Sequence, residues 1–307
     1  MTAAFNETST TDQVLEGVDL SGKRAVVTGA SAGLGVETVR ALASRGAAIV
    51  AAVRDQDKAK RALSEAGVGP GVTLIELDLS SLASARKAAD AIVSAGAPID
   101  LIINNAGIMA CPQGVTADGF ETQLGTNHLG HFVFANRIAP LLRAGGRVVV
   151  LSSSAHRICD VDLDDPAFAK TDYEPWQAYG RSKTANALYA VGLDKRLRGR
   201  DVRVAAVHPG VIQTELMRHL TPELEARIKA SGVTYKTVPQ GAATSIWAGV
   251  RAPADTVGGK FCEDCHVAHV NDDPLTRGGV RSYALDEARA DALWALSERM
   301  TGERFAF

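Results

Sequence analysis

The stretch Arg24–Gly46, RAVVTGASAGLGVETVRALASRG, decides how the rest of the chain is interpreted. Its apolar, β-branched beginning predicts a strand, and the apolar spacing from Gly33 onward predicts a helix. Three glycines lie where the strand turns into the helix, Gly29, Gly33 and Gly35. Glycine permits a positive φ and lets the backbone approach a pyrophosphate without an intervening Cβ. The helix would direct free N–H groups and the positive end of its dipole at phosphates, so the stretch predicts a dinucleotide site.

The alternation of strand and helix continues along the chain. Apolar runs recur at 47–53, 72–78, 99–107, 145–154 and 201–210, and helical patterns separate them. Runs without polar alternation are typical of strands buried on both faces, and crossovers of helix length are typical of parallel pairing. The chain therefore predicts an α/β fold, a doubly wound parallel sheet with helices on both faces. No linker or repeat divides it, so we expect one domain over residues 1–307, with a polar arm at 1–20.

Composition argues against several classes of protein. A net charge of −2 gives no electrostatic reason to expect nucleic acid or an anionic membrane as a partner. The N-terminus lacks a basic region followed by an apolar run, which argues against a secretory signal. No stretch approaches the roughly 18 apolar residues of a membrane span. A cytoplasmic protein with reduced thiols is expected, and its four cysteines do not form a disulfide framework, Cys111, Cys159, Cys262 and Cys265.

A tyrosine–lysine pair supplies candidate acid/base chemistry. Tyr179 and Lys183 lie four residues apart on a predicted helix, so their side chains share one face. Reduction of a carbonyl by hydride puts negative charge on oxygen, which must then be protonated. A free tyrosine has a pKa of about 10, too high for ready proton exchange at neutral pH. We expect the Lys183 ammonium to lower the pKa of Tyr179 toward the working range.

Further motifs carry a resemblance to a known family. Asn104-Asn105-Ala106-Gly107 follows the fourth predicted strand, Ser152–Ser154 follows the fifth, and His208-Pro209-Gly210 follows the sixth. With the glycine loop and the tyrosine–lysine pair, they span roughly residues 20 to 215 in an order that resembles the short-chain dehydrogenase/reductase family. Three short segments resemble the retinol-dehydrogenase-like and WW-domain-oxidoreductase-like branch: NHLGHF (Asn127–Phe132), SSSAH and HPGV.

The resemblance implies roles for individual residues. Tyr179 would act as acid/base, Ser153 would hold the carbonyl oxygen, and Lys183 would also bind the nicotinamide ribose. Asn127 would anchor a water in a proton relay through the lysine. Alignment of SSSAH favours Ser153 over its two neighbours. The implied sheet has seven strands, the last at 258–261. The implied cofactor contacts are Gly29, Ser31, Gly33, Leu34, Gly35, Arg54, Asp78, Leu79, Asn105, Ala106, Gly107, Tyr179, Lys183, Pro209, Gly210, Val211 and Thr214.

The end of the second predicted strand bears on the choice of cofactor. An acid there would bind the ribose hydroxyls of NAD, whereas an arginine suits the 2′-phosphate of NADP. Arg54 follows the strand directly, and Asp55 comes one position later. NADP(H) is therefore favoured, and NAD(H) stays open because Ala32 leaves the glycine loop without a second basic residue. By the resemblance, Asp78 would meet the adenine amino group.

Substrate recognition is expected beyond the carboxyl ends of the strands. We interpret residues 212–238 as a lid with apolar side chains, Leu216, Met217, Leu220 and Ile228. Phe168, Tyr173 and Trp176 are placed to line an entrance. The branch resemblance suggests a lipophilic ketone, aldehyde or secondary alcohol as the small-molecule substrate, and a homodimer or homotetramer is compatible with it.

Other functions stay open at this point. Cys262-x-x-Cys265-His266 has the spacing of a c-type haem attachment site, and with His269 it could be drawn as a zinc site. By the resemblance the same residues form the seventh strand and its exit loop near the substrate entrance, where the thiols would confer sensitivity to oxidants. An acidic run is more typical of a solvated loop than of a cation site, Asp160, Asp162, Asp164 and Asp165. A protein that binds NADP(H) as a redox sensor without turnover is the remaining alternative; no metal is expected.

Overall fold

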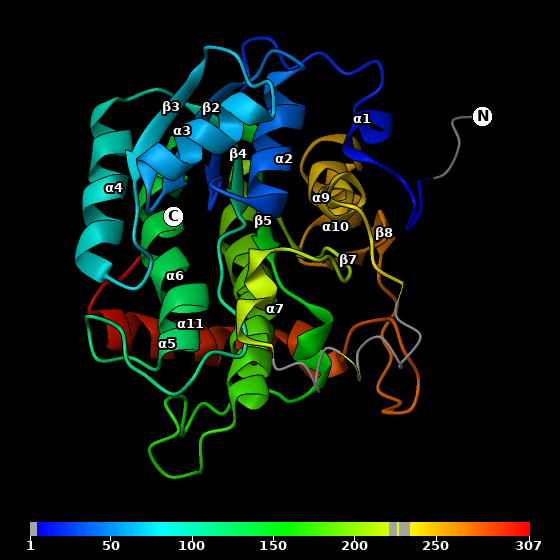
Figure 1. The fold of residues 1–307 in the computed structure, drawn as a ribbon. Helices are drawn as coiled ribbons and strands as arrows, with labels where there is room; N and C mark the ends of the chain where they lie inside the picture. Colours follow the sequence, from blue (N-terminus) through cyan, green and yellow to red (C-terminus); the bar gives the residue numbers. More distant parts are fainter. Residues whose placement is uncertain (1–4, 221–225, 227–233) are drawn as a thin grey trace.

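One largely parallel sheet organises the chain in the computed structural model, which describes residues 5–220, 226 and 234–307 (Figure 1). Its order is β3-β2-β1-β4-β5-β6-β7-β8, and only β7 and β8 pair antiparallel. The strands are β1 Arg24–Thr28, β2 Ala48–Val53, β3 Val72–Glu76, β4 Ile99–Asn104, β5 Leu142–Leu151, β6 Arg203–His208, β7 Phe261–Glu263 and β8 His266–Val267. The order reverses between β1 and β4, which is where open α/β sheets bind ligands.

Helices cover both faces of the sheet (Figure 1). One face is covered by α1 Thr11–Val14, α2 Gly33–Ala43, α3 Gln56–Glu65, α9 Val238–Ile246 and α10 Ala254–Val257. The other is covered by α4 Leu82–Ser94, α6 Gly130–Ile138 and α7 Pro175–Leu197, with α5 Thr122–Leu124 and α11 Glu287–Thr301 packed against α7. The π-helical turns are Gly125–Leu129 and Trp247–Arg251. The 3₁₀ turns are Ala139–Leu141, Ser154–Arg157, Arg198–Arg200, Glu215–His219 and Ser282–Leu285.

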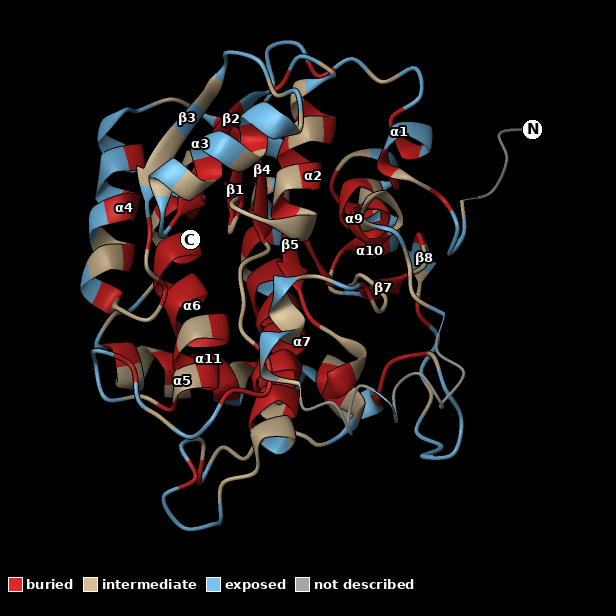
Figure 2. Ribbon diagram, in the orientation of Figure 1, coloured by how far each residue is buried: buried red, intermediate tan, exposed pale blue. Residues whose placement is uncertain are grey.

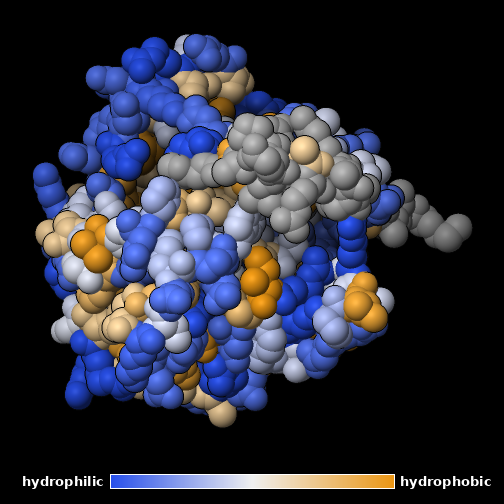
Figure 3. Space-filling model, turned by 60° about the horizontal axis from the view of Figure 1, so that its bottom comes forward, coloured by the Kyte–Doolittle hydropathy of each residue, from blue (hydrophilic) through white to orange (hydrophobic). Residues whose placement is uncertain are grey.

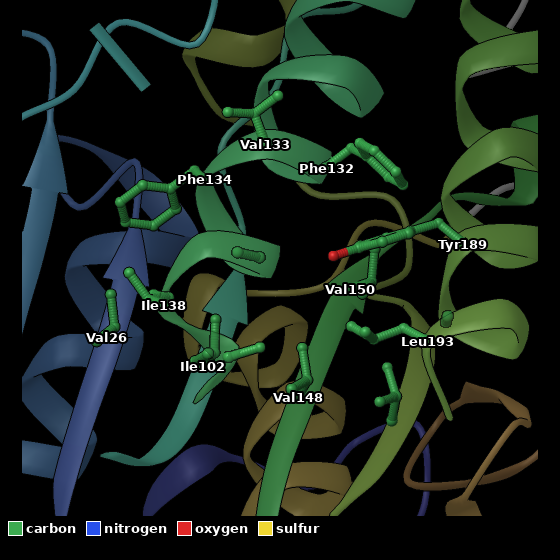
Figure 4. Close-up of a cluster of buried hydrophobic side chains, with 14 of the residues drawn as sticks. Val26, Ile102, Phe132, Val133, Phe134, Ile138, Val148, Val150, Tyr189 and Leu193 are labelled. Atoms are coloured by element: carbon green, nitrogen blue, oxygen red, sulfur yellow. The ribbon is translucent and has the colours of Figure 1, made fainter. Parts of the chain in front are cut away.

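Aromatic packing holds α6, α7 and α11 together behind the sheet. Figure 4 shows the side chains that α6 and α7 contribute, Phe132 and Tyr189 among them. The Phe132 ring is completely buried, with its centroid 5.7 Å from that of Tyr189 and 4.9 Å from that of Trp294. The buried Tyr189 hydroxyl donates to Asn136 Oδ1 at 2.8 Å, so it is not left unpaired. Figure 2 shows the central strands and the inner faces of these helices as buried, whereas α3 and α4 expose their outer faces. The strand ends next to α6 and α7 are therefore rigidly supported.

The doubly wound parallel sheet is confirmed, but the predicted count of seven strands is one too low. The eighth strand, β8, has only two residues. The turn before it places Asp264 and Cys265 at positive φ without a glycine, so the usual hairpin signal is missing from the sequence. The seventh strand also begins at Phe261, three residues later than predicted. The C-terminal helix α11 has no counterpart among the predicted elements.

The predicted N-terminal arm is anchored from residue 5 onward. The Thr11 hydroxyl donates to the buried carboxylate of Glu37 on α2, and Arg40 forms an ion pair with Asp12 at 2.8 Å. Elsewhere on the surface, exposed large apolar side chains are scattered, and the face drawn in Figure 3 is mainly hydrophilic with separate hydrophobic spots. In the described part of the chain, none of the helices combines the length and apolar content that crossing a bilayer requires.

Three buried histidines predict sensitivity to acid. Burial lowers the pKa of His128 to about 3, and that of His131 and His156 to about 4. Unfolded, these groups take up protons below their ordinary pKa of about 6.5, so their contribution is fully present above that pH. As pH falls from there toward 4, the free energy of unfolding should drop by about 1.4 kcal/mol per pH unit for each histidine.

Urea unfolding at pH 7, 6 and 5 measures this slope. In His128→Gln the slope should be smaller by the contribution of one histidine, about 1.4 kcal/mol per pH unit. His266→Gln, at an exposed position, should leave the slope unchanged. A slope between pH 6.5 and 5 that His128→Gln does not reduce would contradict the assignment.

Candidate active site

A cavity of about 980 Å³ opens at the carboxyl ends of the strands. Ser153 lines it, and so does every residue that the family resemblance implied for the cofactor: Gly29, Ser31, Gly33, Leu34, Gly35, Arg54, Asp78, Leu79, Asn105, Ala106, Gly107, Tyr179, Lys183, Pro209, Gly210, Val211 and Thr214. These residues come from the ends of β1 to β6, from the start of α2, from α7 and from the chain after β6. The predicted cofactor and catalytic residues thus share one cavity, apart from Asn127.

The glycine turn has the form that a pyrophosphate requires. Gly29 has a φ of +73°, and a Cβ there would lie 2.8 Å from Ala106 Cα. A Cβ on Gly35 would lie 2.3 Å from the Gly29 carbonyl oxygen. The N-cap of α2 is Ala32, which has no side chain to accept from the first helical N–H groups. Those donors stay available at the positive end of the helix dipole, so the turn fits a phosphate group.

A threonine ties the glycine turn to the neighbouring strand end. Thr28 Oγ1 accepts from Asn105 N–H at 2.9 Å and from Ala106 N–H at 3.0 Å. In return, the Asn105 side-chain amide donates to the Thr28 carbonyl at 2.8 Å. Asn105 therefore positions two strand ends, in addition to lining the cavity. The sequence contained a signal for this role, since a threonine precedes the glycine loop directly.

The end of the second strand contributes one acidic and one basic side chain to the cavity wall, Asp55 and Arg54. Asp55 Oδ1 accepts from Lys58 N–H at 2.8 Å and so caps the N-terminus of α3. Asp55 and Arg54 are both exposed at the cavity wall, but one carboxylate oxygen of Asp55 is engaged by the cap. Lys58 lines the same wall and was missed from the sequence, although it follows Arg54 by four residues on a predicted helix. Its ammonium pairs with Glu215, across the cavity, at 2.5 Å.

The structure separates the roles of the three consecutive serines. Ser152 is buried, and its hydroxyl donates to the Lys183 carbonyl at 2.7 Å. Ser153 Oγ accepts from Ala155 N–H at 3.1 Å, and the Ser153 hydroxyl acts to lower the pKa of Tyr179. The Ser154 N–H donates to His208 Nδ1 at 3.2 Å, at the start of a 3₁₀ turn. Of the three hydroxyls, that of Ser153 is the one that affects the pKa of the tyrosine.

The electrostatics of Tyr179 differ from the expected lowering of its pKa. Burial is the largest effect and raises the pKa of Tyr179 to about 12, with the Ser153 hydrogen bond opposing it. Lys183 Nζ lies 5.6 Å from the tyrosine ring centroid and donates to the Leu151 carbonyl at 3.1 Å. Burial lowers the pKa of Lys183 to about 8. Among the protein groups alone, a protonated tyrosine thus faces a lysine that is cationic at neutral pH.

Asn127 is buried behind the cavity and does not line it. Its Oδ1 accepts from Ile108 N–H at 2.8 Å, and its Nδ2 donates to the Ile108 carbonyl and to Ser182 Oγ, both at 2.9 Å. Both hydrogens of the amide are therefore used by protein groups. The side chain fixes the turn after β4. A relay water could therefore bind Asn127 only by donating to a free lone pair of its side-chain or main-chain oxygen.

Several residues singled out in the sequence lie away from the cavity. Phe168 is buried beneath Arg181, whose guanidinium carbon is 4.0 Å from the ring centroid, and Tyr173 donates to the Cys111 carbonyl at 3.0 Å. Only Trp176 of the three predicted entrance aromatics lines the cavity. Asp165 accepts four hydrogen-bond donors of its own loop, from Ala169 to Thr171, so the acidic run organises this loop.

The Cys-x-x-Cys-His stretch does not converge on a site. Cys262 and Cys265 are buried in the core, and burial raises their pKa values to about 12 and about 11. His266 is exposed, and none of the three lines the cavity. The thiols are therefore shielded, contrary to the expected place at the substrate entrance. Among the described residues, no group of three His, Cys, Asp or Glu side chains is arranged to hold a metal ion.

The part of the cavity next to Tyr179 is apolar. Met109, Ala110 and Ala155 form a small buried cluster with the tyrosine, and the partly buried side chains packed on it are Trp176, Leu216, Met217 and Leu220. Three of the four predicted apolar lid residues thus contact this end of the cavity; Ile228 lies outside the described residues. Met109 was missed from the sequence, although it directly follows the Asn-Ala-Gly motif and Ile108.

Comparison with known proteins agrees with the fold and the motifs. The family model for short chain dehydrogenase matches residues 23–225. A probable oxidoreductase of Streptomyces lividans is 42% identical over 294 residues, which cover 90% of this chain and 97% of that protein. Human retinol dehydrogenase 12 is 39% identical over 293 residues, covering 94% of this chain and 89% of that protein.

A solved structure is similar over almost the whole length. The crystal structure of an uncharacterised protein from Mycobacterium paratuberculosis has a TM-score of 0.75 and 34% sequence identity. The similarity covers 99% of this chain and 100% of that one. The chain therefore belongs to the short-chain dehydrogenase/reductase family, in its retinol-dehydrogenase-like branch, and is an NAD(P)-dependent oxidoreductase.

Proposed function

We propose that the protein is an NADP(H)-preferring reductase and dehydrogenase that interconverts a carbonyl and a hydroxyl on a lipophilic small molecule. One observation carries the proposal: Tyr179 and Ser153 line the same cavity as the glycine turn. A cofactor whose phosphates lie on that turn can therefore extend toward the two hydroxyls. The nicotinamide, when bound, supplies or accepts the hydride.

Side chains of the protein bind the carbonyl oxygen of the substrate and transfer the proton. In reduction, Ser153 Oγ donates a hydrogen bond to the carbonyl oxygen and stabilises the charge that develops there. Tyr179 then transfers its phenolic proton to that oxygen. The raised pKa of Tyr179 keeps the proton in place at neutral pH, which suits reduction. In oxidation the phenolate must take up the proton of the alcohol, so this direction benefits from the positive charge of Lys183 nearby.

The preference for NADP(H) is supported by the end of β2. Arg54 is exposed at the cavity wall, and its planar guanidinium is suited to a phosphate. One oxygen of the neighbouring Asp55 carboxylate caps α3, which reduces its capacity for ribose hydroxyls. Lys58 places a second basic group at this wall, where its ammonium pairs with Glu215.

A lipophilic substrate is supported by the side chains around Tyr179. Met109, Trp176, Leu216 and Met217 are apolar and only partly or barely exposed. Burying an apolar surface against them is favourable by about 25 cal/mol per Å². The relative from human is named a retinol dehydrogenase, and retinol is such a substrate.

Replacement of Tyr179 by phenylalanine tests the chemistry. Tyr179→Phe removes the phenolic proton and keeps the ring, so the rate of NADPH-dependent carbonyl reduction should fall about 10²- to 10⁴-fold while NADPH affinity is retained. The assay uses hydrophobic aldehydes and ketones, all-trans-retinal among them. Tyr235→Phe is the matched control, because among the described residues the Tyr235 hydroxyl has no hydrogen-bond partner and does not line the cavity. An unchanged rate in Tyr179→Phe would overturn the mechanism, and NADPH binding without turnover of any carbonyl by the wild type would favour a redox sensor.

Replacement of Arg54 by serine tests the cofactor preference. A hydrogen bond to a charged group contributes about 1.5–3 kcal/mol, so the Kd for NADPH should rise about tenfold to a hundredfold. The Kd for NADH should change less than about twofold, because NADH lacks the 2′-phosphate. Quenching of tryptophan fluorescence can report binding, since Trp176 lines the cavity. Arg61→Ser, on the exposed side of α3, is the control. Equal weakening of both cofactors would contradict the assignment.

A further inference from the structure

A buried histidine directly behind Ser153 has no role in the chemistry proposed above. His156 is completely buried at the 3₁₀ turn that follows β5. Its ring nitrogen Nδ1 lies 2.7 Å from the Ser153 carbonyl oxygen, and its own main-chain N–H donates to the same oxygen at 3.1 Å. The carbonyl that determines the orientation of the Ser153 peptide is thus held twice by one residue.

The contacts of the ring determine which nitrogen carries the proton. The main-chain N–H of Arg281 points at His156 Nε2, 3.2 Å away. A backbone N–H can only donate, so Nε2 must offer its lone pair. A neutral imidazole then carries its hydrogen on Nδ1, where it donates to the Ser153 carbonyl. Both nitrogens are satisfied only in this tautomer.

The C-terminal part of the chain keeps the ring in place. The Phe261 ring centroid lies 4.6 Å from that of His156. The His156 carbonyl accepts from the Tyr283 hydroxyl at 2.6 Å and from Thr184 Oγ1 at 3.2 Å. Residues 281–283, far beyond the stretch that the family model matches, therefore hold His156 from two sides.

These contacts bear on the direction of the serine hydroxyl. Ser153 has an extended backbone, with φ −163° and ψ +160°, and its Oγ accepts from Ala155 N–H. If its carbonyl lost the ring contact, the peptide could rotate and carry Oγ away from Tyr179. A displacement of about 1 Å in such a group costs about 100-fold in rate.

We propose that His156 is a positioning residue for Ser153: its Nδ1–H fixes the Ser153 peptide, and the Arg281 main chain fixes the ring. The proposal rests on the proposed function only in that Ser153 acts on the substrate oxygen. His156 does not touch the substrate or the cofactor.

Two substitutions separate the two ring contacts. The side-chain amide of His156→Asn can replace the Nδ1–H donor, because both groups are attached to Cγ. His156→Gln places its amide farther out, where it can accept from Arg281 N–H but cannot replace the donor. We expect kcat to fall about tenfold to a hundredfold in His156→Gln and to recover most of its value in His156→Asn. The Kd for NADPH should stay within about twofold in both.

A double-mutant cycle tests whether the effect passes through Ser153. In a Ser153→Ala background, His156→Gln should cause little further loss of kcat, because the hydroxyl that it positions is gone. His266→Gln, at an exposed histidine, should match the wild type in rate and in unfolding temperature.

Equal losses in His156→Asn and His156→Gln would overturn the proposal, whether they come from misfolding or from slow turnover. Full additivity with Ser153→Ala, or a wild-type rate in His156→Gln, would overturn it as well. Failure of the proposed function is seen separately, as an unchanged rate in Tyr179→Phe.

Discussion

The contact between the ends of β1 and β4 is the constraint around which the site is arranged. Thr28 Oγ1 accepts two main-chain N–H groups, those of Asn105 and Ala106. This contact brings Ala106 so close to Gly29 that a Cβ at position 29 has no room. The glycine turn is therefore required by a neighbouring strand as well as by a phosphate. The start of α2, with its free N–H groups, takes its position from the same contact.

The constraint extends from Thr28 to the residues behind the cavity. Because its oxygen already accepts two N–H groups, the Thr28 hydroxyl has its own proton left to donate, to His131 Nε2 at 2.9 Å. His131 Nδ1 then carries the other hydrogen and donates to the Asn127 carbonyl at 3.0 Å. This neutral ring resembles His156 in form, since each holds the main-chain carbonyl of a polar residue next to Tyr179 or Lys183. Buried imidazoles of fixed tautomer thus support both sides of the site without adding charge to it.

Local patterns in the sequence predicted the features of the fold and the site that depend on neighbouring residues. Strand and helix periodicity and the glycine spacing were sufficient for the parallel sheet and for one wall of the cavity. Contacts between separate segments were not predictable. The Phe168 ring packs against the Arg181 guanidinium, and Cys262 is buried in the core although its spacing resembles a ligand motif. The predicted shift of the Tyr179 pKa was wrong in direction. The helical spacing between Tyr179 and Lys183 does not reveal that the tyrosine is buried, or that the Lys183 ammonium donates to the Leu151 carbonyl.

The two ends of the cavity follow different physical rules. At the adenosine end, Lys58 pairs with Glu215 of the lid, but both side chains are well exposed, at 39% and 61%. A pair of this kind contributes about 0–1 kcal/mol, too little to hold a lid closed. At the other end, Leu216 and Met217 pack on the cluster around Tyr179, and this apolar contact is the stronger one. An apolar substrate that enters there replaces the lid's own packing with similar contacts. Under the proposed function, substrate binding and the position of the proposed lid would therefore be coupled through apolar surface, whereas the cofactor preference would depend on charge at the far end of the same cavity.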